Sequence, residues 1–244
     1  MAQDKRAEIE FHKKLSMQII EEECSEGVHK KIMNLIKLDF KKAKSVLDAG
    51  CGCGYGSSYI SNTTGCIVVS FDISRSAILF AMKHYKGAKN EFLIMDGSHL
   101  AFRSNMFDAV CAFEVIEHIR NYKGFLSELH RVLKYGGLLI LSTPNKKLSS
   151  PFREKPINPY HVKEFCLDEL EDLLKDYFIN LRIFGEFTIL RNRFIRSAIK
   201  KLRKILPSVV KRFEWFVNYK VKIKSDNVNN ANYFVIICSK GKGY

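Results

Sequence analysis

Five short apolar runs, separated by segments with helical spacing, constrain the fold of this 244-residue chain more than any other feature. Strands that are apolar on both faces need cover on both faces, and helical connections between them join parallel strands. The pattern therefore predicts an α/β fold with a doubly wound, mostly parallel sheet. The five expected strands are 45–49, 66–72, 91–96, 107–113 and 138–142.

Two later apolar runs, 180–188 and 232–238, predict two added strands and so a sheet of seven. The length suits one domain with a full core. We therefore predict a single domain over 1–244. Its expected parts are N-terminal helices over 1–40, a core over 41–188, a basic amphipathic helical insertion over 189–228 and a last strand within 229–244.

A glycine-rich loop follows the first expected strand, in the sequence Val-Leu-Asp-Ala-Gly-Cys-Gly-Cys-Gly from Val46 to Gly54. Ligands of doubly wound sheets bind at such strand ends. The dinucleotide fingerprint G-x-G-x-x-G does not fit, because its third glycine falls on Tyr55 in one register and on Ser57 in the other. The loop instead has the pattern acid-x-G-x-G-x-G, starting at Asp48.

This pattern resembles motif I of the class I S-adenosylmethionine (SAM)-dependent methyltransferases, in particular type 11 and ubiquinone-pathway-like enzymes. Four further segments resemble that family's motifs in the expected order. They are Asp72, Asp96-Gly97, Phe107-Asp108 with Glu114 to His118, and Leu133 to Gly137. The resemblance covers about residues 40–188 and the last strand, and it implies a Rossmann-like fold and methyltransferase activity.

The resemblance also implies a SAM pocket. In the family, the motif I acid orients the cofactor's amino-acid portion and the glycines line the loop beneath it. The acid after the second strand bonds the ribose hydroxyls, since a carboxylate accepts two hydroxyl hydrogens at once. The acid after the third strand lies near the adenine amino group. The expected cofactor-binding residues are Asp48, Gly50, Gly52, Gly54, Asp72, Asp96, Gly97 and Glu114.

The run Glu114-x-x-Glu117-His118 follows the fourth expected strand, and His161 lies in a loop after the fifth. Two interpretations stay open. In the first, the set is similar to the metal-binding residues of small-RNA 2′-O-methyltransferases and ubiquinone-pathway O-methyltransferases. Glu114, Glu117, His118 and His161 would then bind Mg²⁺ or a similar divalent cation. In the second, His118 or His161 acts as a catalytic general base.

The net charge of +14 is concentrated in residues 191–224, which hold twelve Lys or Arg and one acid, Glu214. Apolar residues recur at helical spacing over 193–217. Three interpretations fit this basic segment: a packed lid, an interfacial helix on an anionic membrane, or a nucleic-acid contact. We favour a membrane-proximal role over nucleic acid, because no RNA-binding module is recognisable and the aromatic residues share a face with the aliphatic ones.

The expected function is transfer of a methyl group from SAM to oxygen on a small-molecule, lipid-linked or saccharide-linked acceptor. An RNA methyltransferase and a non-catalytic SAM-binding protein are the alternatives. Apolar runs long enough to span a bilayer are absent, and so is a secretory signal, which leads us to expect a cytoplasmic protein that can associate with a membrane surface.

Overall fold

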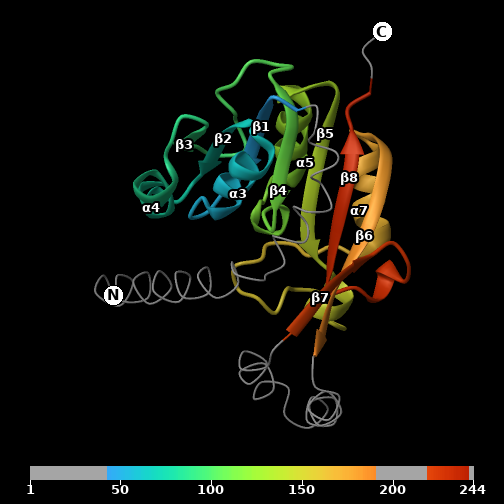
Figure 1. Ribbon diagram of the computed structural model, residues 1–244. Helices are drawn as coiled ribbons and strands as arrows, with labels where there is room; N and C mark the ends of the chain where they lie inside the picture. The colour runs from blue at the N-terminus through green and yellow to red at the C-terminus, as the bar shows by residue number, and fades with distance from the viewer. Residues whose placement is uncertain (1–42, 191–218, 242–244) are drawn as a thin grey trace.

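The computed structural model describes residues 43–190 and 219–241, and these form one eight-stranded sheet in the order β3-β2-β1-β4-β5-β8-β6-β7 (Figure 1). Parallel pairing joins the first five strands of that order, and antiparallel pairing joins the rest. The strands are β1 (Ser45–Ala49), β2 (Ile67–Asp72), β3 (Asn90–Ile94), β4 (Phe107–Phe113), β5 (Leu133–Pro144), β6 (Ile179–Leu190), β7 (Tyr219–Lys224) and β8 (Tyr233–Ser239).

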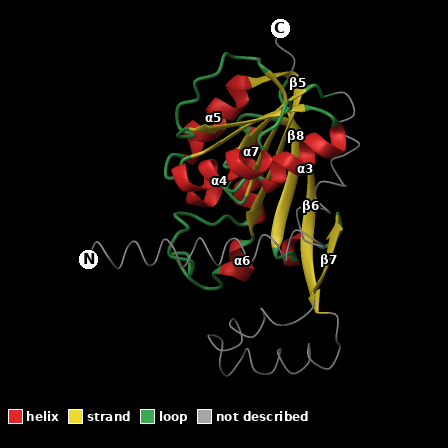
Figure 2. Ribbon diagram, turned by 60° about the vertical axis from the view of Figure 1, so that its left-hand side comes forward, coloured by secondary structure: helices red, strands yellow, loops and turns green. Residues whose placement is uncertain are grey.

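Helices flank the sheet, as Figure 2 shows. The longer ones are α3 (Tyr55–Thr64), α4 (Arg75–Tyr85), α5 (Tyr122–Val132) and α7 (Leu167–Lys175). Three short turns of helix lie near the strand ends: η2 (Ile116–His118), α6 (Lys146–Ser149) and η4 (Val228–Asn230). Ser74 caps α4, and its side chain accepts a hydrogen bond from the backbone N–H of Ala77.

Apolar side chains fill both faces of the sheet because successive residues of a strand point to opposite sides. Val46 packs in a buried cluster with Ile60 of α3. Its neighbour Leu47 packs in a separate cluster with residues of α5 and α7, including Phe125 and Leu170. The predicted Rossmann-like α/β class is thereby confirmed.

The predicted helical insertion over 189–228 is corrected at both of its ends. β6 continues to Leu190, and residues 219–224, expected to be part of the helical segment, form β7 as an eighth strand. The two strands pair from Gly185 with Lys224 to Leu190 with Tyr219. The six residues of β7 alternate Lys with Tyr, Val and Ile, and this period of two favours a strand.

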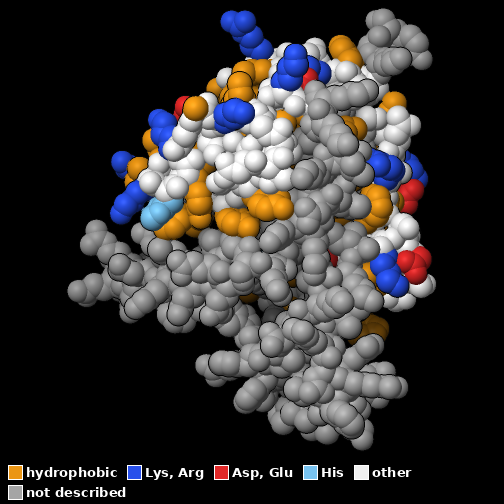
Figure 3. All heavy atoms as spheres, viewed as in Figure 1, with side chains coloured by type: hydrophobic (Ala, Val, Ile, Leu, Met, Phe, Trp, Pro, Cys, Tyr) orange, Lys and Arg blue, Asp and Glu red, His pale blue; other side chains and the backbone are white. Residues whose placement is uncertain are grey.

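The helices expected over 1–40 and the remainder of the basic segment, 191–218, lie outside the described residues. Within the part that is described, no helix is long and apolar enough to cross a bilayer. On the part of the surface that Figure 3 draws in colour, Lys and Arg side chains are spread out, and several lie beside Asp or Glu side chains. The described core therefore shows no single basic field on that face.

Candidate active site

The glycine loop lies where β1 ends and α3 begins, and all three of its predicted glycines adopt positive φ. A Cβ on Gly50 would lie 2.5 Å from Cγ2 of Val115, so this glycine lets the loop touch the segment after β4. A Cβ on Gly52 would meet nothing within 4 Å. The loop is therefore tightly packed at Gly50 and open at Gly52, as a cradle for a ligand requires.

Asp48 ends up buried beneath this loop, at 4% exposure, and its Oδ2 accepts a hydrogen bond of 2.6 Å from Ser57 Oγ. The pKa of Asp48 is raised to about 6, mainly by burial. The Ser57 hydrogen bond acts to lower this pKa, and the nearby Asp72 carboxylate acts to raise it. Burial makes the charged form of Asp48 unfavourable when no ligand is bound. A buried carboxylate of this kind fits a binding site for a cationic group, such as the ammonium of an amino acid.

Asp72 stands at the end of β2, across the loop from Asp48. Its Oδ2 accepts from the backbone N–H of Gly52 at 2.9 Å, and its Oδ1 accepts from that of Ser74 at 2.8 Å. These two bonds leave further lone pairs on both oxygens, which suits a pair of ribose hydroxyls.

Asp96 and Gly97 follow β3. Asp96 is exposed, and bonds from the backbone N–H and hydroxyl of Ser98 lower its pKa. Gly97 is buried against Phe125, whose ring would lie 2.9 Å from a Cβ there. The structure thus brings the loop, Asp48 and Asp72 together by direct contacts and places Asp96-Gly97 at the end of the strand next to β2.

Two carboxylates follow β4, one half-buried and one buried. The half-buried Glu114 has a φ of +55°, a backbone conformation that is rare for residues with side chains, and its Oε1 accepts from Ser142 Oγ at 2.6 Å. Loss of solvent around the carboxyl group, and then the neighbouring Glu117, raise the pKa of Glu114 well above its ordinary value. Glu117 is 1% exposed, and burial raises its pKa as well, against a bond of 3.0 Å from Thr143 Oγ1.

His118 ends η2 and is exposed. Its Nδ1 lies 2.9 Å from the backbone oxygen of Tyr160. A carbonyl oxygen can only accept, so Nδ1 carries the proton, and Nε2 is the acceptor of the neutral ring. His118 therefore has the tautomer of a general base whose basic nitrogen is Nε2.

His161 lies beside His118, with ring centroids 4.9 Å apart. Its Nδ1 lies 2.6 Å from Oε1 of Glu164, and its Nε2 lies 2.9 Å from Nδ2 of Asn158. The Oδ1 of Asn158 accepts from the N–H of Tyr160 at 3.1 Å, which directs the Asn158 amide N–H toward His161. Both ring nitrogens of His161 are thus engaged within the loop.

Glu164 completes this network from a buried position at 2% exposure. Although burial acts to raise it, bonds from Ser149, Ser150 and His161 hold the pKa of Glu164 below its ordinary value. The same loop is hydrogen-bonded to η2, which follows β4, because the backbone oxygen of Glu117 accepts from the N–H groups of Val162 and Lys163. Asn158, His161 and Glu164 therefore form a hydrogen-bonded network, called the latch below, that holds the loop where the carbonyl oxygen of Tyr160 contacts His118.

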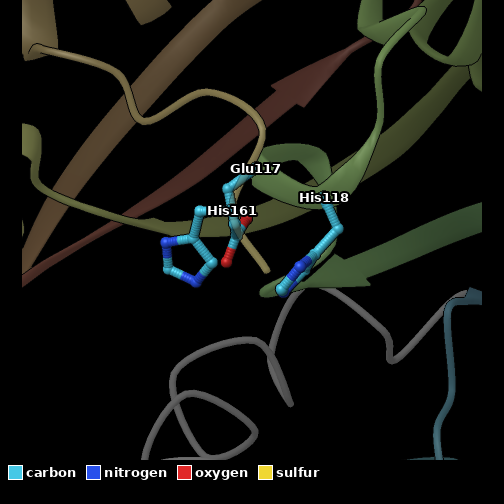
Figure 4. Close-up of side chains that lie close together, drawn as sticks. All are labelled: Glu117, His118 and His161. Atoms are coloured by element: carbon cyan, nitrogen blue, oxygen red, sulfur yellow. The ribbon is translucent and has the colours of Figure 1, made fainter. Parts of the chain in front are cut away.

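Three of the four proposed metal ligands lie together. The candidate ligand atoms of Glu117, His118 and His161 are all within 4.8 Å of one another, and Figure 4 shows the Glu117 carboxylate between the two imidazole rings. Glu114 is outside this group, and its carboxylate is bonded to Ser142. Nε2 of His161 would have to release Asn158 before it could bind a cation.

Ser57, Asn158 and Glu164 were not predicted as site residues, although each orients one that was. The spacing His161-x-x-Glu164 is the one signal that could have pointed to the latch. The contact between Ser57 and Asp48 depends on how α3 leaves the glycine loop, and no local pattern reports that.

Comparison with known proteins adds to this geometry. The methyltransferase domain family matches residues 47–141, from β1 to β5. A probable SAM-dependent methyltransferase of Mycobacterium tuberculosis is 37% identical over 149 residues, which cover 59% of this chain and 52% of that protein. Over residues 47–141 the chain is therefore similar to the methyltransferase domain of SAM-dependent methyltransferases.

Two other similar proteins show the range of names among the matches. The mitochondrial ubiquinone biosynthesis O-methyltransferase of Dictyostelium discoideum is 30% identical over 143 residues, covering 50% of this chain and 44% of that protein. A phosphoethanolamine N-methyltransferase of Haemonchus contortus, solved with S-adenosylhomocysteine and phosphomonomethylethanolamine, shares the fold at a TM-score of 0.58 and 19% identity. That alignment covers 86% of this chain and 52% of the other. The chain spans about half the length of the relatives it matches.

Proposed function

We propose that this chain transfers a methyl group from SAM to an oxygen of a small-molecule, lipid-linked or saccharide-linked acceptor. The match of residues 47–141 to the methyltransferase domain family and the open glycine cradle support SAM as the methyl donor. Bound SAM supplies an electrophilic methyl group on a sulfonium. Asp48, Asp72 and Asp96, with Gly50, Gly52, Gly54, Gly97 and Glu114, are the residues we propose to hold it, as the fit of the loop and carboxylates suggests.

The observation that carries the choice of oxygen is the state of His118. Its Nδ1 is committed to the Tyr160 carbonyl oxygen, so Nε2 can remove a proton from an acceptor hydroxyl. Glu117 lies close enough to stabilise the imidazolium that this proton transfer creates. A hydroxyl needs such a base at neutral pH, whereas methyl transfer to a ready nucleophile depends mainly on orientation. We therefore assign the base to His118 and not to His161.

A divalent cation at Glu117, His118 and His161 is the second candidate, because their ligand atoms converge. A cation there would act as a Lewis acid on the acceptor oxygen. Since His161 and Glu114 are engaged elsewhere, we expect turnover to persist in a chelator. Loss of turnover in a chelator, with recovery on added Mg²⁺ or Mn²⁺, would instead support the metal.

The test is incubation of the full chain with methyl-labelled SAM and fractionated cell extract. We expect release of S-adenosylhomocysteine and label in a small or lipid-soluble product that resists nuclease. Label in nuclease-sensitive material would identify an RNA methyltransferase. Binding of SAM by calorimetry without S-adenosylhomocysteine release in any fraction would identify a non-catalytic SAM-binding protein.

A further inference from the structure

The segment that follows β5 contacts His118 through the backbone oxygen of Tyr160, and it exposes several apolar side chains. We name five of them the apolar rim: Leu148, Phe152, Ile157, Tyr160 and Val162, all exposed. Phe152 has a relative exposure of 109%, so its ring makes essentially no shielding contact with the rest of the protein. Several large apolar side chains exposed along one short segment are candidates for an interaction surface.

The exposure of Phe152 is built into the backbone. Its φ is +60°, a conformation that bulky residues rarely adopt and that usually reflects a constraint from function. The loop around it is well held. Ser150, buried at 1% exposure, accepts from the N–H of Arg153 and, through Oγ, from that of Ile157 at 2.8 Å. The ring is thus presented outward by an ordered loop.

Positive charge accompanies the apolar rim. Lys146, Lys147, Arg153 and Lys155 lie within the same stretch of chain, against one exposed acid, Glu154. Bulky apolar side chains surrounded by cations are the composition of surfaces that dip into the interface of anionic membranes. The aliphatic members of the rim offer no ring for stacking on bases, which argues against a nucleic acid.

The sheet brings the two ends of residues 191–218 together at the end of the sheet where β5 finishes. Tyr233 pairs with Pro144 at the end of β5 and with Glu186 of β6. β6 continues four residues past that level to Leu190, which pairs with Tyr219. Figure 2 shows α6, which begins the loop of the apolar rim, at the same end of the molecule as β7. Residues 191–218, with nine Lys or Arg and one acid, are therefore joined to the sheet at the edge that carries the apolar rim.

We propose that this edge docks on an anionic lipid bilayer, with Phe152 inserted among the acyl chains and Lys146, Lys147, Arg153 and Lys155 against the phosphate headgroups. Docking in this way would place His118 at the membrane surface, within reach of a lipid-borne acceptor. The inference concerns binding alone and stands apart from the proposed methyl transfer.

The experiment puts a single tryptophan reporter on the loop. The only natural tryptophan, Trp215, is replaced by Phe, and Phe152→Trp is then introduced into the full chain. Vesicles of phosphatidylcholine with phosphatidylglycerol are titrated in, including a series with brominated acyl chains. We expect a blue shift and strong quenching by the brominated lipid, both reduced by added salt and by omission of phosphatidylglycerol.

Leu79→Trp in the same background is the matched control, because Leu79 is an exposed apolar residue on α4, far along the sheet from the loop. We expect no shift at position 79. In the natural background, Phe152→Ala is expected to weaken vesicle binding by about tenfold. Vesicle binding with unchanged emission from the Phe152→Trp variant, or equal binding by Phe152→Ala, would overturn the proposal and leave vesicle binding to the basic segment. Absence of vesicle binding at low salt, or capture of a protein partner in place of lipid, would overturn it as well.

Discussion

At the scale of single residues, we expect the buried Asp48 carboxylate to lower the stability of the free protein and to strengthen SAM binding. Because its pKa is raised to about 6 in the folded protein, its contribution to stability is present below its unfolded pKa of about 4 and lost as pH rises through about 6. Asp48→Asn keeps an acceptor for Ser57 and removes the buried charge. We expect this variant to be more stable than the natural protein by about 3 kcal/mol at pH 8, and nearly equal to it near pH 4, in urea unfolding without SAM.

The same substitution should harm SAM binding. If Asp48 meets the cofactor ammonium, Asp48→Asn weakens SAM affinity by about tenfold or more in calorimetry. SAM affinity of the natural protein should likewise fall as pH drops below about 6, since Asp48 then binds a proton. Asp96→Asn, at an exposed position, serves as the control for stability. An unchanged SAM affinity in Asp48→Asn would show that another group holds the ammonium.

The two histidines should separate by their kinetics. His118→Gln removes the proposed base, and we expect kcat to fall by about 10²-fold or more, with SAM affinity nearly unchanged. His161→Gln loosens the hydrogen-bonded network around Tyr160, so kcat should fall by only about tenfold. A larger loss of kcat in His161→Gln than in His118→Gln would reverse the assignment.

At the scale of elements, Lys240 joins three parts of the fold. It is 5% exposed, and its Nζ donates to the backbone oxygens of His130 and Leu133 at 2.9 Å and to Oδ1 of Asn105 at 2.8 Å. The bonds satisfy carbonyl oxygens at the end of α5, where a helix leaves them unpaired.

Lys240→Met retains the apolar stem and removes these three bonds. We expect it to lower the free energy of unfolding by about 2 to 3 kcal/mol, because buried carbonyl oxygens lose their partner. The measurement is urea unfolding, with Lys175→Met on α7 as the control. Lys175 makes surface ion pairs, so its loss should cost much less than the loss of Lys240. Equal effects of the two substitutions would contradict the capping role.

Elements differ in how well the sequence predicts them, and the difference has a physical cause. Strands β1, β2, β4 and β5 are largely buried, so continuous apolar runs are enough to identify them in the sequence. The edge strand β3 has a similar apolar run, although Leu93 and Ile94 are exposed. β7 lies at the edge of the sheet, and in it Lys alternates with apolar residues. Because these lysines continue the basic run of the preceding residues, the sequence pattern predicts that they belong to the helical segment. The α6 turn is only four residues long and is too short to have a periodicity.

The sequence predicts which residues lie at the candidate site, but it does not predict which hydrogen bonds they make. Motif order brings Asp48, Asp72 and the Glu114 to His118 run to one edge, because the carboxyl ends of parallel strands meet there. Which nitrogen of each histidine is available depends on Asn158, Tyr160 and Glu164, in a loop whose path follows from tertiary hydrogen bonds. The available nitrogen of each histidine decides whether the site suits a general base or a metal ion, and no sequence pattern predicts which nitrogen that is.

At the scale of the whole molecule, the pairing of Leu190 with Tyr219 makes a prediction about domain organisation. The two ends of segment 191–218 are neighbours across an antiparallel ladder, so a two-residue Asn-Gly turn can join them directly. We propose that the described core folds without this segment. Replacing 191–218 by Asn-Gly should then leave the melting temperature within a few degrees and SAM affinity within about twofold, while binding to anionic vesicles falls because nine cations are removed. Melting and SAM calorimetry check the first part, and co-sedimentation checks the second. A variant that fails to fold would show that the segment belongs to the core, whereas a folded variant that binds vesicles as before would place all of the docking on the loop of Phe152.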